Sequence, residues 1–190
     1  SPPLAQRRVR TLMRGLGDAR PVLREVGSIK VKPGDPLPDV ALPSTRGRPM
    51  SPAEFRGKKH VVLYFYPGNN APYPELAGCT AEACAFRDRM QNIRDLDGVV
   101  IGVSRQSVEQ QRAFSEEQML NFVLLSDVQG KLGAAIGVPE IHDGKQVFAK
   151  RVTVIADRHG IVRHVYPVVT PEHHAEEVLT ALLEVQRRYG

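Results

Sequence analysis

Two apolar runs constrain most strongly what this chain can fold into. Residues 60–66 (HVVLYFY) and 98–103 (GVVIGV) are rich in β-branched and aromatic side chains and contain almost no polar ones. Runs of this length and composition are typical of strands that are buried on both faces of a sheet. We therefore expect a sheet whose central strands are covered by further elements on both sides.

The elements expected around these two strands alternate along the chain. Apolar residues at helical spacing predict a helix from about residue 79 to 94. The remaining predicted elements are helices at 107–119 and 131–136, strands at 122–125, 151–156 and 161–166, and a last helix from residue 171. Strands 151–156 and 161–166 flank turn residues and so predict a hairpin. The alternation predicts an α/β fold of three layers, with a central mixed sheet flanked by helices.

The positive charge of the chain lies in its first 30 residues. The net charge is +5, and residues 1–30 alone hold seven basic and two acidic side chains, so residues 31–190 are neutral overall. A nucleic-acid-binding fold carries its charge on the folded surface, which argues against that partner. We predict a basic N-terminal extension (1–30) and one domain (31–190). The extension is either an arm that packs on the domain or on a second subunit, or a targeting remnant.

The chain has two cysteines, Cys79 and Cys84. This number excludes a disulfide-stapled scaffold and a four-cysteine zinc site. Cys79 follows Gly78 at the predicted start of a helix, where unpaired N–H groups and the helix dipole stabilise an anion. We therefore expect a lowered thiol pKa and a nucleophilic cysteine. The competing interpretation is a small buried apolar residue.

The spacing between the two cysteines limits what they can do together. On an intact helix their Cα atoms are roughly 8–9 Å apart. A disulfide needs a separation of less than about 7 Å, so the first helical turns must unwind if the two ever bond. The spacing is also not C-x-x-C, so thioredoxin-type dithiol chemistry is not the natural interpretation.

No pattern in the sequence predicts a cofactor. The six histidines lack the paired spacing of metal ligands, and the glycines lack the spacing of a phosphate-binding loop. We expect no metal, haem or flavin. No apolar run approaches the length of a membrane span, so we expect no membrane-spanning segment.

Several segments resemble a known family. Residues 61–67 (VVLYFYP) and 78–88 (GCTAEACAFRD) are similar to the signature of the peroxiredoxins, in particular the peroxiredoxin Q or bacterioferritin comigratory protein group. Shorter similarities lie at residues 31–43, 124–127, 151–157 and 174–179, so the resemblance covers about residues 31–188. It implies a thioredoxin-like fold and a thiol-dependent reduction of hydrogen peroxide or organic hydroperoxides.

The resemblance also implies roles for five residues. Cys79 would be the peroxidatic cysteine, whose thiolate attacks the O–O bond and becomes a sulfenic acid, and Cys84 the resolving cysteine, which condenses with it to a disulfide. Arg151 matches the arginine that stabilises the thiolate and the charge developing on the peroxide. Thr80 and Glu82 fall within the motif. Glu82 either orients Arg151 or is a favourable acid in the first helical turn.

The chain departs from the family pattern just before Cys79. Leu76 stands where the family has a Thr or Ser that helps to hold the peroxide, so we expect the loss of a contact worth about 1–3 kcal/mol. Pro67 lies twelve residues before Cys79, which makes the loop about five residues longer than in the family. The polar residues of this loop that could replace the hydroxyl are Asn69, Asn70 and Tyr73.

The leading hypothesis is a thioredoxin-dependent peroxidase of the atypical two-cysteine type, monomeric or homodimeric, that a thioredoxin or similar dithiol protein reduces. Two reducible cysteines suit the cytoplasm, or an organelle if residues 1–30 are a targeting remnant. A second hypothesis is a peroxiredoxin-like redox sensor or binding module with weak turnover, which Leu76 and the longer loop motivate. A third is a disulfide oxidoreductase that acts on proteins.

Overall fold

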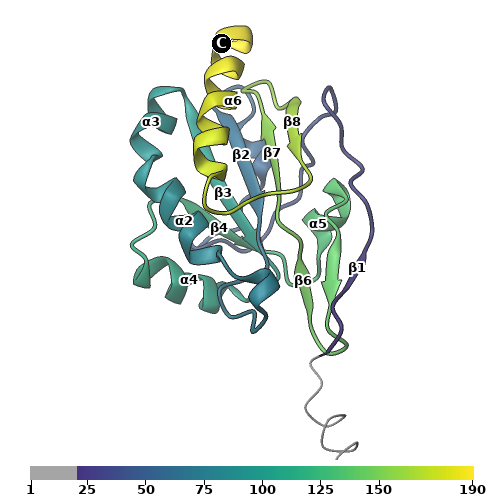
Figure 1. Ribbon diagram of the computed structural model, residues 1–190. Helices are drawn as coiled ribbons and strands as arrows, with labels where there is room; N and C mark the ends of the chain where they lie inside the picture. Colours follow the sequence, from purple (N-terminus) through teal and green to yellow (C-terminus); the bar gives the residue numbers. More distant parts are fainter. Residues whose placement is uncertain (1–20) are drawn as a thin grey trace, which may run out of the picture.

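The structure, a computed structural model, describes residues 21–190 (Figure 1). The strands are β1 (Arg24–Val26), β2 (His60–Phe65), β3 (Gly98–Ser104), β4 (Val123–Ser126), β5 (Glu140–His142), β6 (Val147–Ala149), β7 (Val152–Ala156) and β8 (Val162–Tyr166). The α-helices are α2 (Cys79–Asp88), α3 (Met90–Asp95), α4 (Val108–Glu117), α5 (Lys131–Ile136) and α6 (His174–Tyr189), and the 3-10 helices are η1 (Pro52–Phe55) and η2 (Pro74–Leu76).

A five-stranded sheet in the order β4-β3-β2-β7-β8 forms the centre of the fold. β2, β3 and β4 run parallel, whereas β7 is antiparallel to β2 and β8 is antiparallel to β7. The predicted mixed sheet is therefore confirmed. Apart from the helix predicted at 79–94, the predicted strands and helices are present, with ends shifted by up to three residues.

The central strand β2 is buried on both faces, as its apolar run predicts. Val62 and Tyr64 face a core formed with α2, α3, α4 and α6, while Val61 and Leu63 face a second core formed with α5 and the chain before β2. The helices thus lie on both sides of the sheet, which confirms the three-layer α/β arrangement (Figure 1).

The helix predicted at residues 79–94 is interrupted, and this prediction was wrong in that respect. α2 ends at Asp88 and α3 begins at Met90. Arg89 between them donates from Nη1 to the carbonyl oxygen of Ala85 at 3.0 Å and from Nη2 to Glu176 of α6 at 3.0 Å. The side chain of Arg89 thereby satisfies a carbonyl at the end of α2, where the helix itself offers no partner.

A second sheet, in the order β1-β5-β6, has no counterpart in the sequence-based prediction. β1 pairs antiparallel with β5, and Glu25 of β1 forms an ion pair with Lys150 at 3.0 Å. The described part of the predicted extension therefore contacts the following domain. Residues 1–20, on which most of the arm or targeting prediction falls, lie outside the described residues.

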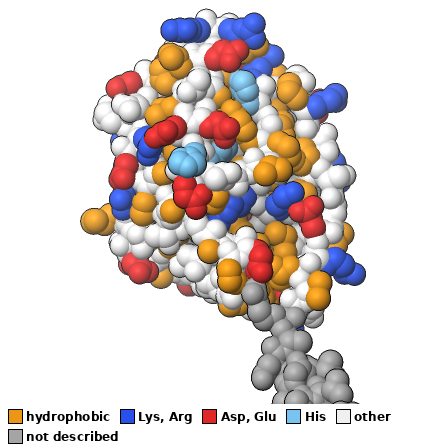
Figure 2. All heavy atoms as spheres, viewed as in Figure 1, with side chains coloured by type: hydrophobic (Ala, Val, Ile, Leu, Met, Phe, Trp, Pro, Cys, Tyr) orange, Lys and Arg blue, Asp and Glu red, His pale blue; other side chains and the backbone are white. Residues whose placement is uncertain are grey.

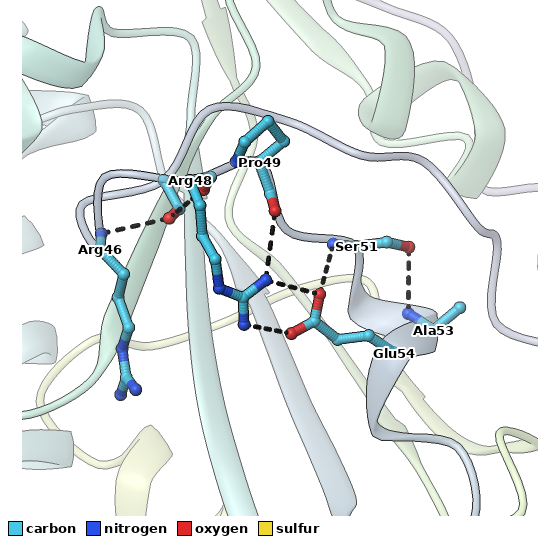
Figure 3. A network of polar contacts seen from close by, with 7 residues as sticks. Arg46, Arg48, Pro49, Ser51, Ala53 and Glu54 are labelled. Carbon is cyan, nitrogen blue, oxygen red and sulfur yellow. Dashed lines mark hydrogen bonds and ion pairs between the residues drawn. The ribbon is translucent and has the colours of Figure 1, made fainter.

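A polar network fixes the chain just before β2 (Figure 3). Ser51 caps η1 and, together with Glu54, forms a capping box in which the Ser51 N–H donates to Glu54 Oε2 at 3.3 Å. Arg48 donates to the other oxygen of Glu54 at 2.9 Å, and this hydrogen bond lowers the pKa of the Glu54 carboxyl. The network orders the segment that leads into the central strand.

The surface charge and the helix lengths bear on nucleic-acid and membrane partners. On the face shown in Figure 2, acidic and basic side chains are interspersed, and neither sign dominates. Within residues 21–190, no helix combines the length and the apolar character that crossing a bilayer requires.

Candidate active site

The site lies where the loop after β2 enters helix α2. Gly78 precedes the helix with a φ of 110°, in the left-handed region that favours glycine. A Cβ atom at this position would lie 2.9 Å from Cγ of Pro171, so the loop before α6 presses against the start of α2. The backbone at residue 78 therefore needs glycine on both counts, and Cys79 becomes the first helical residue.

Cys79 is buried, with 4% of its surface exposed, and Arg151 contacts its sulfur. Nη2 of Arg151 donates to Cys79 Sγ at 3.1 Å, and the thiol lies 3.9 Å from the carbonyl oxygen of Leu76. Arg151 stands just before β7, which pairs with β2 and so comes beside the loop that carries the cysteine. The sheet topology therefore brings together residues that are 72 positions apart.

The guanidinium of Arg151 links three parts of the site. Nη2 also donates to the carbonyl oxygens of Leu76 at 2.9 Å and Ala77 at 3.0 Å. Nη1 donates to Oε1 of Glu82 at 3.0 Å, and the side chain of Glu82 is only 1% exposed. Arg151 thus holds the loop, the sulfur and the carboxylate of α2 in one arrangement.

Burial dominates the ionisation of both acidic groups. It raises the pKa of the Cys79 thiol, and the nearby Arg151 guanidinium and the Gly68 backbone N–H oppose part of that rise. The lowered pKa expected from the helix terminus is therefore wrong, because the loss of solvation outweighs the positive groups. Burial likewise raises the pKa of Glu82 to about 7 against the opposing charge of Arg151. Glu82 Oε2 is buried, and within residues 21–190 it has no hydrogen-bond partner.

Two of the five predicted site residues lie outside this cluster. Cys84 is half-buried, and its sulfur lies 3.4 Å from Oε1 of Gln118, just after α4. Both cysteines are free thiols. Thr80 is exposed. The structure thus brings Cys79, Glu82 and Arg151 together, and it places the second cysteine on another side of α2.

The three polar loop residues considered as replacements for a hydroxyl at Leu76 all have other partners. The Tyr73 hydroxyl donates to Oδ2 of Asp143 at 2.5 Å, and the side-chain oxygens of Asn69 and Asn70 accept from Gln106. Sequence reasoning missed Gly68 of this loop and Gln106, which follows β3 and contacts the loop. The only sequence signal was the glycine directly after Pro67, which marks a turn.

A cavity of about 220 Å³ opens beside Arg151. Its lining includes Leu76 and Ala77, Pro67, and Val168 and Pro171 from the loop before α6. Cys79 is not in this lining, but it contacts Arg151, which is. Within residues 21–190, no three His, Cys, Asp or Glu side chains are grouped closely enough to hold a metal ion.

Comparison with known proteins places this chain in a family. The model of the AhpC/TSA family matches residues 33–165. A chloroplastic peroxiredoxin Q of Sedum lineare is 38% identical over 80% of this chain and 78% of its own length. Peroxiredoxin Bcp of Bacillus subtilis is 34% identical over 82% of this chain and 97% of its own.

Solved structures agree with the sequence comparison. Peroxidoxin BcpB from Mycobacterium tuberculosis has a TM-score of 0.72 and 31% identity, and the match covers 82% of this chain and 98% of that one. Peroxiredoxin Q from Xanthomonas campestris gives 0.68 and 26%, covering 77% and 91%. These matches confirm a thioredoxin-like fold and the activity class of thiol-dependent peroxidases. The chain belongs to the AhpC/TSA family, in which its relatives form the peroxiredoxin Q/Bcp group.

Proposed function

We propose that Cys79 and Cys84 carry out a two-cysteine peroxidase cycle and that a thioredoxin-like dithiol protein completes it. The observation that carries this proposal is the 3.1 Å contact between Arg151 Nη2 and the buried Cys79 sulfur. A fixed cation beside a thiol stabilises the thiolate and the negative charge that moves onto the peroxide oxygens during attack.

In the first step the Cys79 thiolate attacks one oxygen of the hydroperoxide. A sulfur–oxygen bond forms, the O–O bond breaks, and sulfur is oxidised to a sulfenic acid. The other oxygen takes a proton and leaves as water or, from an organic hydroperoxide, as an alcohol. The thiol proton that ionisation releases balances this uptake.

In the second step the Cys84 thiol attacks the sulfenic sulfur, water leaves, and a disulfide forms. Because an intact helix separates the two Cα atoms by roughly 8–9 Å, the first turns of α2 must unwind. Cys79 then leaves Arg151, and Cys84 leaves Gln118. A dithiol protein restores both thiols by disulfide exchange, which suits a reducing compartment such as the cytoplasm. Residues 31–190 form the catalytic domain, and β1 of the preceding extension docks on it.

The test is the intact mass of the reduced protein, followed in time after one equivalent of hydrogen peroxide. We expect the wild-type chain to lose two hydrogens, Cys84→Ser to gain one oxygen, and Cys79→Ser to stay unchanged. A Cys79→Ser protein that consumes peroxide as fast as the wild type contradicts the proposal. A wild-type protein that does not change over minutes favours the sensor or binding module, for which the burial and raised pKa of Cys79 argue.

The identity of residue 76 gives a separate prediction. Thr and Val have almost the same shape, so Leu76→Thr and Leu76→Val differ mainly by one hydroxyl. If that hydroxyl holds the peroxide, we expect the threonine variant to react about tenfold faster than the valine variant, within the range of one added hydrogen bond. Stopped-flow rates with hydrogen peroxide measure the difference. Equal rates mean that a hydroxyl at this position does not reach the reacting atoms.

A further inference from the structure

A chain of buried amide side chains connects the active-site loop to the sheet. Gln106, just after β3, is 6% exposed and donates from Nε2 to the side-chain oxygens of Asn69 at 2.8 Å and Asn70 at 3.1 Å. A primary amide has two N–H bonds, so this one side chain holds two consecutive loop residues.

Gln106 is itself fixed from the interior of the fold. Its Oε1 accepts from Ser104 Oγ at 3.1 Å, and Ser104 Oγ accepts from Gln111 Nε2 at 2.9 Å. Gln111 also donates to the carbonyl oxygen of Leu125 in β4 at 2.7 Å. Ser104 and Gln111 are fully buried. A connected network of this kind is rigid, so β3, β4 and α4 together determine where the Gln106 amide points.

The loop residue that lies on this amide is Gly68. A Cβ atom there would lie 2.9 Å from Cδ of Gln106 and 3.0 Å from Oδ1 of Asn70, and its φ of 119° is again in the region that favours glycine. Pro67, directly before Gly68, lines the cavity beside Arg151, and the Gly68 N–H lies close enough to Cys79 to lower the pKa of that thiol. Beside Arg151, this N–H is a second positively polarised group near the sulfur, in a site where residue 76 offers no hydroxyl.

We propose that Gln106 is a positioning residue of the peroxidase site: by clamping Asn69 and Asn70 it fixes the peptide that directs the Gly68 N–H at Cys79. The inference rests on the proposed function, because it takes the Cys79 thiolate as the reacting species. The inference also explains how the long loop is held in one conformation. A longer loop has more conformations to lose on ordering, and the Gln106 clamp restricts it near the sulfur, while the Tyr73–Asp143 hydrogen bond restricts it farther along.

The test measures the ionisation of Cys79 without using peroxide. In a Cys84→Ser background, the rate of Cys79 alkylation by iodoacetamide is followed from pH 6 to 10.5. We expect Gln106→Leu to raise the pKa of Cys79 by about one unit and to slow alkylation at pH 7 about tenfold, as the loss of one donor to a thiolate predicts. The reaction with hydrogen peroxide slows by a similar factor. Gln91→Leu, the same change at an exposed position of α3, leaves both unchanged.

Further variants separate positioning from stability. Asn69→Ala/Asn70→Ala, at two exposed positions, should reproduce the effect of Gln106→Leu, and combining both changes should add nothing. Gln106→Glu should recover the wild-type rate to within about threefold, because the two asparagines can turn their N–H groups towards the carboxylate. If Gln106→Leu and the double variant lower the melting temperature but leave the pKa of Cys79 unchanged, the proposal is wrong. A wild-type chain inert to peroxide refutes the proposed function alone, since the alkylation profile still tests the clamp.

Discussion

Replacing Arg151 by Met slows the reaction of Cys79 with hydrogen peroxide at pH 7 by about 100- to 1000-fold. Removing one preorganised donor from the charge that develops in a transition state has an effect of this size. The variant loses the donor 3.1 Å from the sulfur and the charge that opposes the rise in the pKa of Cys79. The rate rises with pH as the Cys79 thiol ionises, and we therefore also expect this rise to move to higher pH in the variant. Stopped-flow rates between pH 6 and 10 measure the shift.

Two further variants show whether the geometry of Arg151 or only its charge matters. Arg151→Lys keeps the charge, but one ammonium cannot span the loop carbonyls, the sulfur and Glu82, so we expect an intermediate rate. Arg163→Met is the matched control. Arg163 pairs with the buried Asp157, with 2.7 Å between Nε and Oδ2, and this ion pair does not contact the active site. Arg163→Met should lower stability and leave the Cys79 rate unchanged. Equal slowing by Arg151→Met and Arg163→Met would show that both act only through stability.

The central sheet could be predicted because local pattern and tertiary burial agree there. β2 is buried along its whole length, and its apolar run contains only one strongly polar side chain, His60. That histidine is also buried, between Gln186 of α6 and the backbone N–H of Arg158. Where the local apolar pattern agrees with burial in the fold, the position of a strand can be predicted without information from distant residues.

The second sheet could not be predicted because its three short strands pair with one another and carry little sequence pattern of their own. β1, β5 and β6 have three residues each, and no side chain of β1 is buried. β1 forms its ladder with residues more than 100 positions away. A strand of this length has no periodicity to detect, and its propensity depends on the partner.

The candidate active site also has a part that could be predicted from the sequence and a part that could not. The start of α2 at Cys79 follows from Gly78 and from the apolar stripe that Cys79 shares with Phe86, but that stripe also places the thiol in the core, where burial raises its pKa. The link from Gln106 to the loop at residue 69 joins positions 37 apart, and no spacing rule connects them. The pKa of Cys79 and the hydrogen bonds between distant residues could therefore be determined only from the folded structure.

Glu82 makes the reduced protein less stable as the pH rises from about 4.5 to 7. Its pKa is about 7 in the folded chain against an ordinary value of 4.5. Between these values the folded carboxyl keeps a proton that the unfolded chain has released, so the unfolded state binds fewer protons and the free energy of unfolding falls with pH. The full effect is up to about 3 kcal/mol above pH 7. Burial lowers the pKa of His174, which acts in the opposite direction below about pH 6.5.

Glu82→Gln isolates the carboxyl from these other groups. The amide keeps an oxygen for Arg151 Nη1 and cannot ionise, so we expect the variant to lose the fall in stability and to exceed the wild type above pH 7. Urea unfolding of the reduced proteins at pH 5, 6, 7 and 8 measures this. Glu117→Gln, an exposed change of the same chemistry on α4, should follow the wild type.

The same substitution changes the thiol in a defined direction. The negative charge of Glu82 raises the pKa of Cys79, so the amide lets the thiol ionise at lower pH while it still holds Arg151 in place. Glu82→Leu removes the charge and the hydrogen bond together, and it should slow the reaction with peroxide because Arg151 loses its support. If the stability profiles of Glu82→Gln and the wild type run parallel from pH 5 to 8, Glu82 is already ionised in the folded protein and Arg151 compensates its burial completely.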